Sequence, residues 1–259
     1  MSKKDIIGLC LALLAFSGCV SGKIPEVTRG PLSHPYDILS KITIPDSGDT
    51  IRATARITLS SSEGTYSRKL ALLLRMPSSL RAEAIPFFGP ADFFLSANEE
   101  VLKVFLPGEG KFYVGAATRK NISLFFKIFL SPADIVPLLA GLPPHIPGGR
   151  LSEHVEERLY RVDIQSGKRK RSLWIDPGDY TLTRIEDSDD GRTIWMAAFA
   201  DHIVVSGVPY PRKIRIEMEE PERVKMNIRY LDLDTVSTGD TANFDLQIPS
   251  GITPIPIDR

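Results

Sequence analysis

Few side chains in this 259-residue chain have the type and spacing that catalysis or metal binding requires. The four histidines are His34, His145, His154 and His202. No two of them have the helical spacing with which paired histidines bind zinc, and no Gly-x-Ser-x-Gly elbow or P-loop is present. An acidic turn at Asp187, Asp189 and Asp190 is a cation-binding candidate, although such turns are usually only solvated. The sequence therefore predicts no enzyme, no metal site and no cofactor.

Cys19 is the residue whose surroundings indicate a specific reaction. Lys3 and Lys4 precede an apolar run of 11 residues, 6–16, which is too short to span a bilayer as a stable helix and is typical of an export signal. The sequence Phe16-Ser17-Gly18-Cys19 resembles the lipobox of bacterial lipoproteins, with Phe16 in place of the usual leucine. The resemblance implies that the thiol receives a diacylglycerol, that the signal is cut before Cys19, and that the new amine is acylated. The alternative is an ordinary signal with an incidental cysteine.

A tether is predicted between this anchor and the folded part of the chain. Residues 1–18 would form the lipoprotein signal peptide, and residues 19–48 contain prolines, glycines and serines with little periodicity, as linkers do. Two or more acyl chains anchor a protein firmly, because each buried methylene contributes about 0.8 kcal/mol. Val20 occupies the position at which the enterobacterial sorting rule uses aspartate for inner-membrane retention. This predicts the periplasmic face of the outer membrane, provided that the rule applies.

The charge balance and the cysteines exclude two other classes of protein. The formal net charge is zero, so a nucleic-acid-binding surface is not expected. Both cysteines lie within the first 19 residues, which excludes a disulfide framework in the rest of the chain.

Alternating apolar and polar residues predict strands on both sides of one helical insert. Before the insert this period-two pattern occupies residues 51–59, 70–76, 80–84, 93–95, 102–106 and 112–114. After it the pattern returns in residues 159–164, 173–175, 180–185, 192–205, 213–218 and 224–230. So many consecutive antiparallel strands curl or close. The predicted fold is mainly β: a half-open antiparallel barrel of about eleven or twelve strands over residues 49–250, with a helical lid and a tail at 251–259.

The insert, residues 118–144, has the only convincing helical pattern. Its apolar residues recur at the i, i+3, i+4, i+7 spacing, as Ile122, Phe125, Phe126 and Phe129. Ser131 and Asp134 predict a capping box that begins a second helix. A helix as apolar as the first must be buried almost all round or must face an apolar ligand. The insert is therefore either a core helical hairpin or a lid over a cavity in a curved sheet.

The lid alternative predicts an acyl-chain cavity between the insert and the first strands. Its lining would comprise Leu70, Leu72, Leu74, Ala82, Ala84, Phe93, Leu95, Ile122, Phe125, Phe126 and Phe129. The turn at residues 85–90 is a second apolar feature, because polar residues are expected in such a link. Phe87 and Phe88 either fold inward as core or form an exposed tip that contacts a membrane or a lipid chain.

Several short motifs occur in a fixed order along the chain. They are Pro86-Phe87-Phe88-Gly89, the turn 107–110, Tyr113, the apolar helix 122–130, Ser131-Pro132, Gly141-Leu142-Pro143, the strand 211–218 and the ending 244–249. Together they resemble the LolB-like branch of the LolA/LolB superfamily, which handles lipoproteins in the Gram-negative envelope. The likeness covers most of residues 50–250.

The resemblance implies a half-open barrel with a helical lid and an apolar cavity. It implies a lipid-anchored receptor that takes lipoprotein acyl chains from a soluble periplasmic carrier and releases them into the outer membrane. A protruding leucine in a proline-leucine-glycine turn serves release in the family, and Phe87-Phe88 stand there, one residue longer and aromatic. We expect a monomer whose partners are acyl chains, such a carrier and the membrane. The alternative is a lipid-binding or structural envelope lipoprotein of the same fold with different cargo.

Overall fold

A computed structural model of the chain describes residues 34–46, 48–146, 148–156, 158–237 and 244–257. The described residues all belong to one compact unit. The predicted signal peptide, the lipobox and Cys19 lie outside the described residues. Within the described ranges, no helix has the length and apolar character needed to cross a bilayer.

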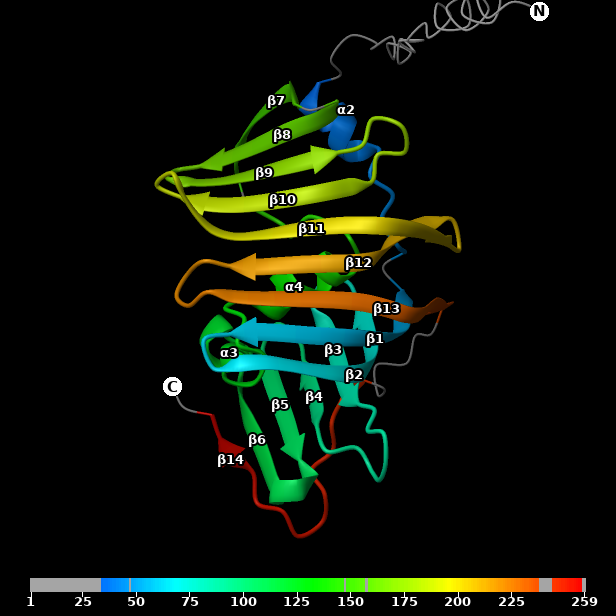
Figure 1. Cartoon of the computed structure of the whole chain (residues 1–259), viewed down its shortest axis with the longest axis vertical. Helices are drawn as coiled ribbons and strands as arrows, with labels where there is room; N and C mark the ends of the chain where they lie inside the picture. Colours follow the sequence, from blue (N-terminus) through cyan, green and yellow to red (C-terminus); the bar gives the residue numbers. More distant parts are fainter. Residues whose placement is uncertain (1–33, 47, 147, 157, 238–243, 258–259) are drawn as a thin grey trace, which may run out of the picture. The chain divides into compact units, whose positions relative to one another are not determined.

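A single 14-stranded sheet dominates the structure (Figure 1). Its strands are β1 (Asp49–Ser61), β2 (Gly64–Arg75), β3 (Ser79–Ala84), β4 (Phe94–Ala97), β5 (Val101–Leu106), β6 (Lys111–Ala116), β7 (Arg150–Glu156), β8 (Leu159–Ser166), β9 (Arg169–Ile175), β10 (Leu182–Asp189), β11 (Arg192–Val205), β12 (Val208–Met218), β13 (Val224–Ser237) and β14 (Ile255–Pro256). The order is β14-β6-β5-β4-β3-β2-β1-β13-β12-β11-β10-β9-β8-β7. Neighbouring strands are antiparallel except for the parallel pair β14 and β6.

The sheet consists of two consecutive meanders that join at their first and last strands. Strands β1–β6 form one meander and β7–β13 the other, and β1 pairs with β13 from Asp49↔Ser237 onward. Because β14 and β7 are the two ends of the strand order, the sheet remains open. The predicted class, a mainly β half-open barrel with a small helical insert, is confirmed. Strands β7 and β14 were not expected from the sequence.

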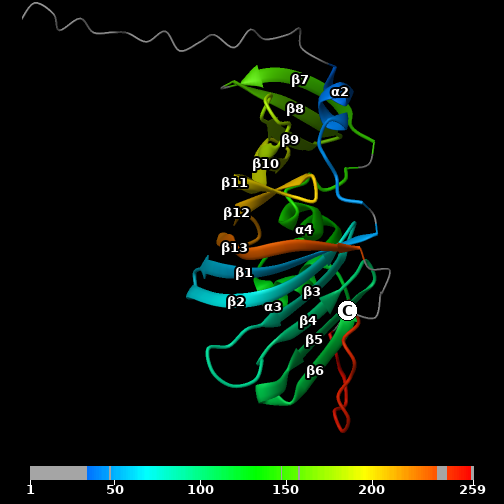
Figure 2. The ribbon, with the colours of Figure 1, turned by 90° about the vertical axis from the view of Figure 1, so that its right-hand side faces the viewer.

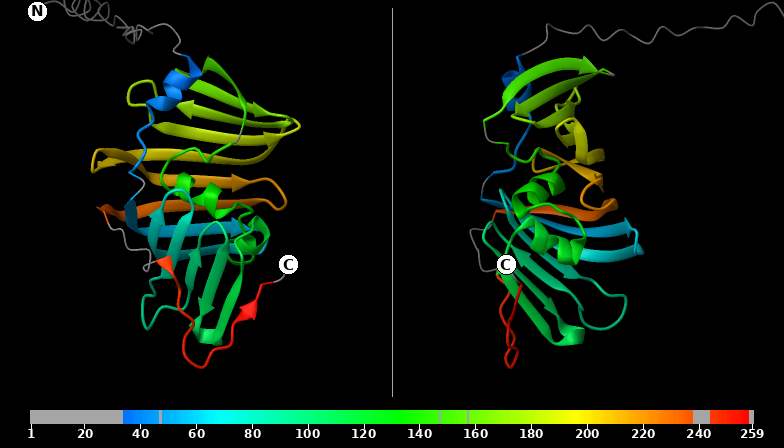
Figure 3. Two further views of the ribbon diagram at one scale, coloured as in Figure 1. Left: turned by 180° about the vertical axis from the view of Figure 1, so that it is seen from behind. Right: turned by 90° about the vertical axis from the view of Figure 1, so that its left-hand side faces the viewer.

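The helical insert lies on one face of this sheet, as Figures 2 and 3 show. It consists of α3 (Arg119–Phe126) and α4 (Pro132–Leu139). The predicted capping box is present, since the Ser131 hydroxyl accepts from the Asp134 amide while the Asp134 carboxylate accepts from the Ser131 amide. Gly141 follows α4 with a φ of 75° and approaches Pro211 so closely that an added Cβ would lie 2.5 Å from its Cδ. The position therefore needs glycine for both its backbone and its packing.

The first helix is one turn shorter than its apolar period predicts. Lys127 adopts a left-handed conformation with a φ of 56° and caps α3. The next helix begins at Pro132, and a residue before proline avoids the helical region, so Ser131 is extended with a ψ of 164°. Residues 128–130 must therefore run as a connection, and Phe129 lies outside the helix.

The main core lies between the sheet and α4 with the start of α3. The inward-facing residues of β1–β5 and of β12 and β13 pack against Ile122, Ile135 and Leu138, each of which is at most 4% exposed. The alternation seen in the sequence follows from this arrangement, because one face of each central strand covers the core while the other faces solvent.

Two segments near the ends of the described chain also pack on the sheet. Within the stretch predicted as tether, α2 (Pro35–Ser40) buries Ile38 completely. At the other end, Phe244 is buried, its ring lies 4.6 Å from the Arg75 guanidinium, and its carbonyl accepts from the Ser96 hydroxyl. The chain then reaches β14, where the amide of Ile257 donates to the carbonyl of Val114 at 2.8 Å.

Candidate functional site

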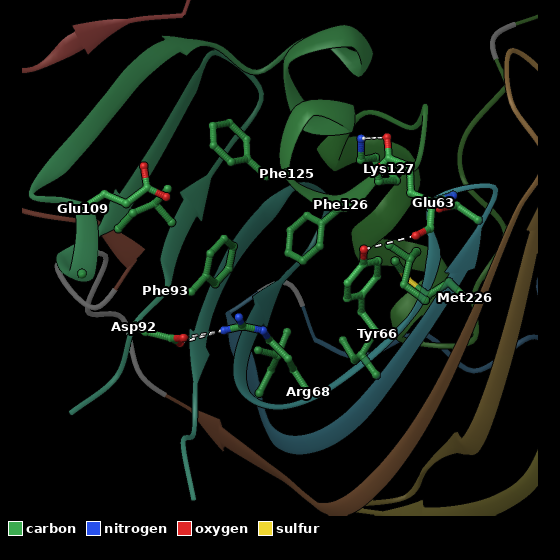
Figure 4. Close-up of a pocket in the computed structure, with 16 residues that line it drawn as sticks. Glu63, Tyr66, Arg68, Asp92, Phe93, Glu109, Phe125, Phe126, Lys127 and Met226 are labelled. Carbon is green, nitrogen blue, oxygen red and sulfur yellow. Dashed lines mark hydrogen bonds and ion pairs between the residues drawn. The ribbon is translucent and has the colours of Figure 1, made fainter. Parts of the chain in front are cut away.

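A cavity of about 520 Å³ opens beside the C-terminal end of α3 (Figure 4). Its walls come from the β1–β2 hairpin, β13, the link between β5 and β6, and the residues that precede β4. The volume lies within the range of about 300–1,000 Å³ that is typical of small-molecule sites. The cavity is open to solvent on one side, since several of its lining residues, such as Tyr66, are largely exposed.

The walls of this cavity are predominantly apolar. Its apolar lining comprises Ile57, Leu59, Leu70, Phe93, Leu106, Phe125, Phe126 and Met226. The rings of Phe93 and Phe126 meet edge to face with their centroids 5.8 Å apart. The ring centroids of Phe125 and Tyr113 are 5.6 Å apart. A flexible chain without polar groups can bind such a surface through burial of apolar area alone.

Charged side chains stand around the cavity mouth as ion pairs (Figure 4). The Lys127 ammonium donates to the Glu63 carboxylate at 3.0 Å and links the end of α3 to the β1–β2 hairpin. This hydrogen bond raises the pKa of Lys127. The Arg68 guanidinium donates to both carboxylate oxygens of Asp92 at 2.8 Å. Because all four side chains are substantially exposed, solvent screens both ion pairs and they stabilise a closed mouth only weakly.

The structure divides the predicted cavity residues into three groups. Leu70, Phe93, Phe125 and Phe126 line the open cavity. Six others are buried in the closed core and do not line it: Leu72, Leu74, Ala82, Ala84, Leu95 and Ile122. Phe129 is 37% exposed and borders a separate surface hollow of about 230 Å³ with Met218 and Pro221.

Sequence reasoning did not include several residues of the cavity wall. Ile57 and Leu59 belong to the predicted strand 51–59, but their place beside the cavity depends on where the helices cover the sheet. Met226 enters through the β1–β13 pairing, in which it lies opposite Leu59. No sequence pattern indicates that pairing, because the two strands are far apart in the chain.

Phe87 and Phe88 lie at the surface in the link between β3 and β4. They are 91% and 84% exposed, and their rings contact each other edge to face at 4.6 Å. The alternative that they fold inward as core is therefore wrong. A pair of adjacent aromatic rings in water is unfavourable for a soluble surface and is typical of a contact site.

Polar contacts fix the insert on the sheet. The Tyr230 hydroxyl donates to the Leu139 carbonyl at 2.8 Å, and burial raises the pKa of this phenol. The Arg119 guanidinium donates to the Asp134 carboxylate at 3.0 Å and joins the two helices. At the end of α3, Phe125 and Phe126 contact the rings of Tyr113 and Phe93, and the exposed Lys127 pairs with Glu63.

Of the three carboxylates of the acidic turn, Asp189 and Asp190 are exposed, whereas Asp187 is buried in an ion pair. The side chains of Asp187 and Arg171 are at most 1% exposed, and the Arg171 guanidinium donates to the Asp187 carboxylate and to the Pro144 carbonyl. Arg169 donates to the same carboxylate at 2.9 Å. These contacts fix the segment that leaves α4. In the part of the chain that the structure describes, no group of three or more His, Cys, Asp or Glu side chains is arranged to hold a metal ion.

Comparison with known proteins identifies the fold. No protein-family model and no curated protein sequence matches the chain. A crystal structure described as an outer membrane lipoprotein-sorting protein domain from Vibrio parahaemolyticus is similar, with a TM-score of 0.56, 15% identity, and coverage of 81% of this chain and 94% of the other. A LolA superfamily protein from Nitrosomonas europaea has a TM-score of 0.51 and 13% identity, with coverage of 78% and 93%.

A DUF1329 family protein from Desulfovibrio piger has a TM-score of 0.58 and 14% identity, with coverage of 82% and 98%. The similarity to each structure spans nearly the whole of the other chain and most of this one. At such low identity it establishes the fold alone. This chain therefore has the fold of LolA superfamily and lipoprotein-sorting domain proteins: an open, curved antiparallel sheet with a helical insert on one face.

Proposed function

We propose that this protein is an outer-membrane lipoprotein that binds the acyl chains of other lipoproteins in the cavity beside α3 and helps to insert them into the membrane. The observation that carries the proposal is the cavity itself, which is apolar, open and walled by aromatic side chains from the insert. The shared fold supports it, since two of the similar structures are described as a LolA superfamily protein and a lipoprotein-sorting domain.

The arrangement suggests how cargo would enter and leave. The acyl chains would displace solvent from the cavity, where each buried methylene is favourable by about 0.8 kcal/mol. The exposed ion pairs at the mouth would open at little energetic expense. Phe87 and Phe88 would contact the membrane during release, and the lipid on Cys19 would hold the protein at the periplasmic face of the outer membrane. No catalytic step is needed, because the acyl chains move between two apolar environments.

Blocking the cavity tests its role as a binding site. Leu59→Trp replaces an aliphatic side chain of the wall with a larger indole ring. It should abolish binding of a fluorescent long-chain fatty acid to the unlipidated mature chain. Ile248→Trp, at a position that is 47% exposed and outside the cavity, is the matched control and should bind normally. Equal probe binding by both variants, with both folded, would place the site elsewhere.

A second candidate is a lipid-binding or structural envelope lipoprotein with other cargo. The similar DUF1329 protein favours keeping this candidate, since its description names no lipoprotein sorting. Mass spectrometry of material that copurifies with the mature chain separates the two. Acylated protein supports lipoprotein delivery, whereas phospholipid alone supports the second candidate.

A further inference from the structure

Four basic side chains form a row across the face of the sheet opposite α3 and α4. The strand register places Lys69 on β2 opposite Arg56 on β1, Arg56 opposite Arg229 on β13, and Arg229 opposite Lys213 on β12. We call these four residues the basic row. All four are exposed. Each has at least one neighbour in its strand that is buried in the core: Ala55, Leu70, Ile214, Ile228 and Tyr230. In Figure 1 the central strands β12 and β13 lie in front of α4, so the side of the sheet without helices faces the viewer.

The basic row violates the usual pairing rule for antiparallel strands. Like charges directly opposite each other destabilise a sheet, because adjacent strands are only about 5 Å apart. Lys213 has one counterion, Asp201, at 3.3 Å. Among the described residues, no carboxylate forms an ion pair with Lys69, Arg56 or Arg229.

The end of the basic row lies beside the exposed aromatic pair. Arg56 and Lys69 line a surface hollow of about 540 Å³ together with Ile85, Pro86 and Phe87. The Ile85 amide donates to the Lys69 carbonyl at 2.8 Å, so this link begins directly against β2. A second hollow continues along the row between Arg56, Arg229 and Lys213 and contains no carboxylate. Positive charge and exposed aromatic rings therefore form one continuous surface.

We propose that the basic row and the Phe87–Phe88 pair together dock the protein on a membrane surface that contains anionic phospholipid headgroups. The aromatic rings would enter the apolar layer while the cations pair with phosphates at the level of the headgroups. The exposed aromatic pair favours a membrane over an acidic protein as the partner, because its rings can enter an acyl layer. The inference builds on the proposed function, since it names the lipid class that the receptor meets at release.

This docking would also determine the direction in which the cavity opens. Arg68 and Asp92 line both the acyl cavity and the hollow that contains Phe87. Headgroups bound by Arg56 and Lys69 would therefore lie directly beside the mouth of the cavity. Cargo would leave next to the point at which the aromatic pair enters the membrane.

The test measures cosedimentation of the unlipidated mature chain, residues 19–259 with Cys19→Ala, with phosphatidylcholine vesicles that contain or lack phosphatidylglycerol. A triple variant, Arg56→Gln, Lys69→Gln and Arg229→Gln, removes the three unpaired cations. Each basic residue near an anionic surface contributes about fivefold in binding, so this variant should lose roughly 100-fold on anionic vesicles. High salt should weaken the unmodified chain in the same way.

A matched control removes equal charge elsewhere, with Lys120→Gln, Lys168→Gln and Arg192→Gln. This control should retain most of its binding, because its residues lie outside the basic row. The row variant should have a thermal midpoint equal to or above that of the unmodified chain, because it lacks the repulsion between opposed cations. Loss of vesicle binding without loss of thermal stability therefore identifies a docking surface.

Equal losses in both triple variants would overturn the proposal, because they would show that only net charge matters. Undiminished vesicle binding by the row variant would also overturn the proposal. This would hold even if the row variant no longer bound an acidic protein. Binding of the fluorescent fatty acid is measured in parallel. If the chain binds the fatty acid but its vesicle binding does not depend on the basic row, only the docking surface is refuted. If vesicle binding depends on the basic row but the chain does not bind the fatty acid, only the acyl cavity is refuted.

Discussion

Replacing Phe87 and Phe88 by glutamate should separate release of cargo from folding and uptake. Both rings are at least 84% exposed, so the double variant should change the free energy of unfolding by no more than about 0.5 kcal/mol per position. Burying one phenylalanine in an acyl layer is favourable by about 1.5–3 kcal/mol, so the pair would supply about 3–6 kcal/mol of membrane contact. Its loss should slow transfer into membranes by roughly 10²–10⁴-fold.

The assay loads the mature chain with a labelled lipoprotein and follows transfer of the label to liposomes, with thermal unfolding recorded in parallel. Uptake of cargo should be normal, because neither Phe88 nor the exposed ring of Phe87 lines the acyl cavity. The matched control is Ile44→Glu with Val204→Glu, two apolar residues that are 63% and 72% exposed elsewhere. It should transfer at the unmodified rate.

Unchanged transfer by the Phe87→Glu, Phe88→Glu variant, with stability also unchanged, would refute a role of this link in release. A large loss of stability would contradict the exposures on which the argument depends. Equal slowing in the control would show that added negative charge, and not the loss of two aromatic rings, opposes the membrane.

Three further predictions concern other parts of the chain. Cys19→Ala should leave an uncleaved precursor that incorporates no labelled fatty acid, and persisting incorporation would exclude Cys19 as the site. Asp187→Leu should lower the free energy of unfolding by about 3–5 kcal/mol, because Arg171 remains buried without its partner, and Arg171→Met added to it should recover much of the loss. Burial lowers the pKa of His202, whose Nε2 has no hydrogen-bond partner among the described residues. Stability should therefore fall as the pH drops below about 6.5, where the unfolded chain binds the proton first, and His202→Gln should reduce this slope in urea titrations.

The sequence predicted the central strands because their alternation reports a sheet with one buried face. It did not predict β7, in which Arg150, Glu153 and Glu156 interrupt the pattern and no residue is fully buried, since this strand is an edge of the sheet. Strand β14 is too short for a pattern to be visible. An alternating pattern reveals a strand only when one face of the strand is buried, and these edge strands have no fully buried face.

The sequence predicted an apolar cavity beside the helical insert, but it predicted only some of the residues that line the cavity. Leu72 and Phe126 both belong to apolar faces, yet one lies in the closed core and the other beside the open cavity. Which of them meets the cavity depends on where α3 ends, and that is determined by the left-handed Lys127 and by Pro132. The carboxylate of Asp187 was expected in solvent, because its arginine partners lie on another strand and become neighbours only through strand register.

The pairing of β1 with β13 has a consequence for the order in which the chain folds. Asp49 and Ser237, which are hydrogen-bonded across this seam, are 188 residues apart, whereas each meander contains only local hairpins. Long loops close slowly, so the hairpins should form first and the seam last. Until β13 arrives, β1 presents an unpaired edge to which another chain can add. A newly synthesised molecule is therefore most prone to aggregate while only its first meander has folded, and formation of the β1–β13 pairing limits its folding rate.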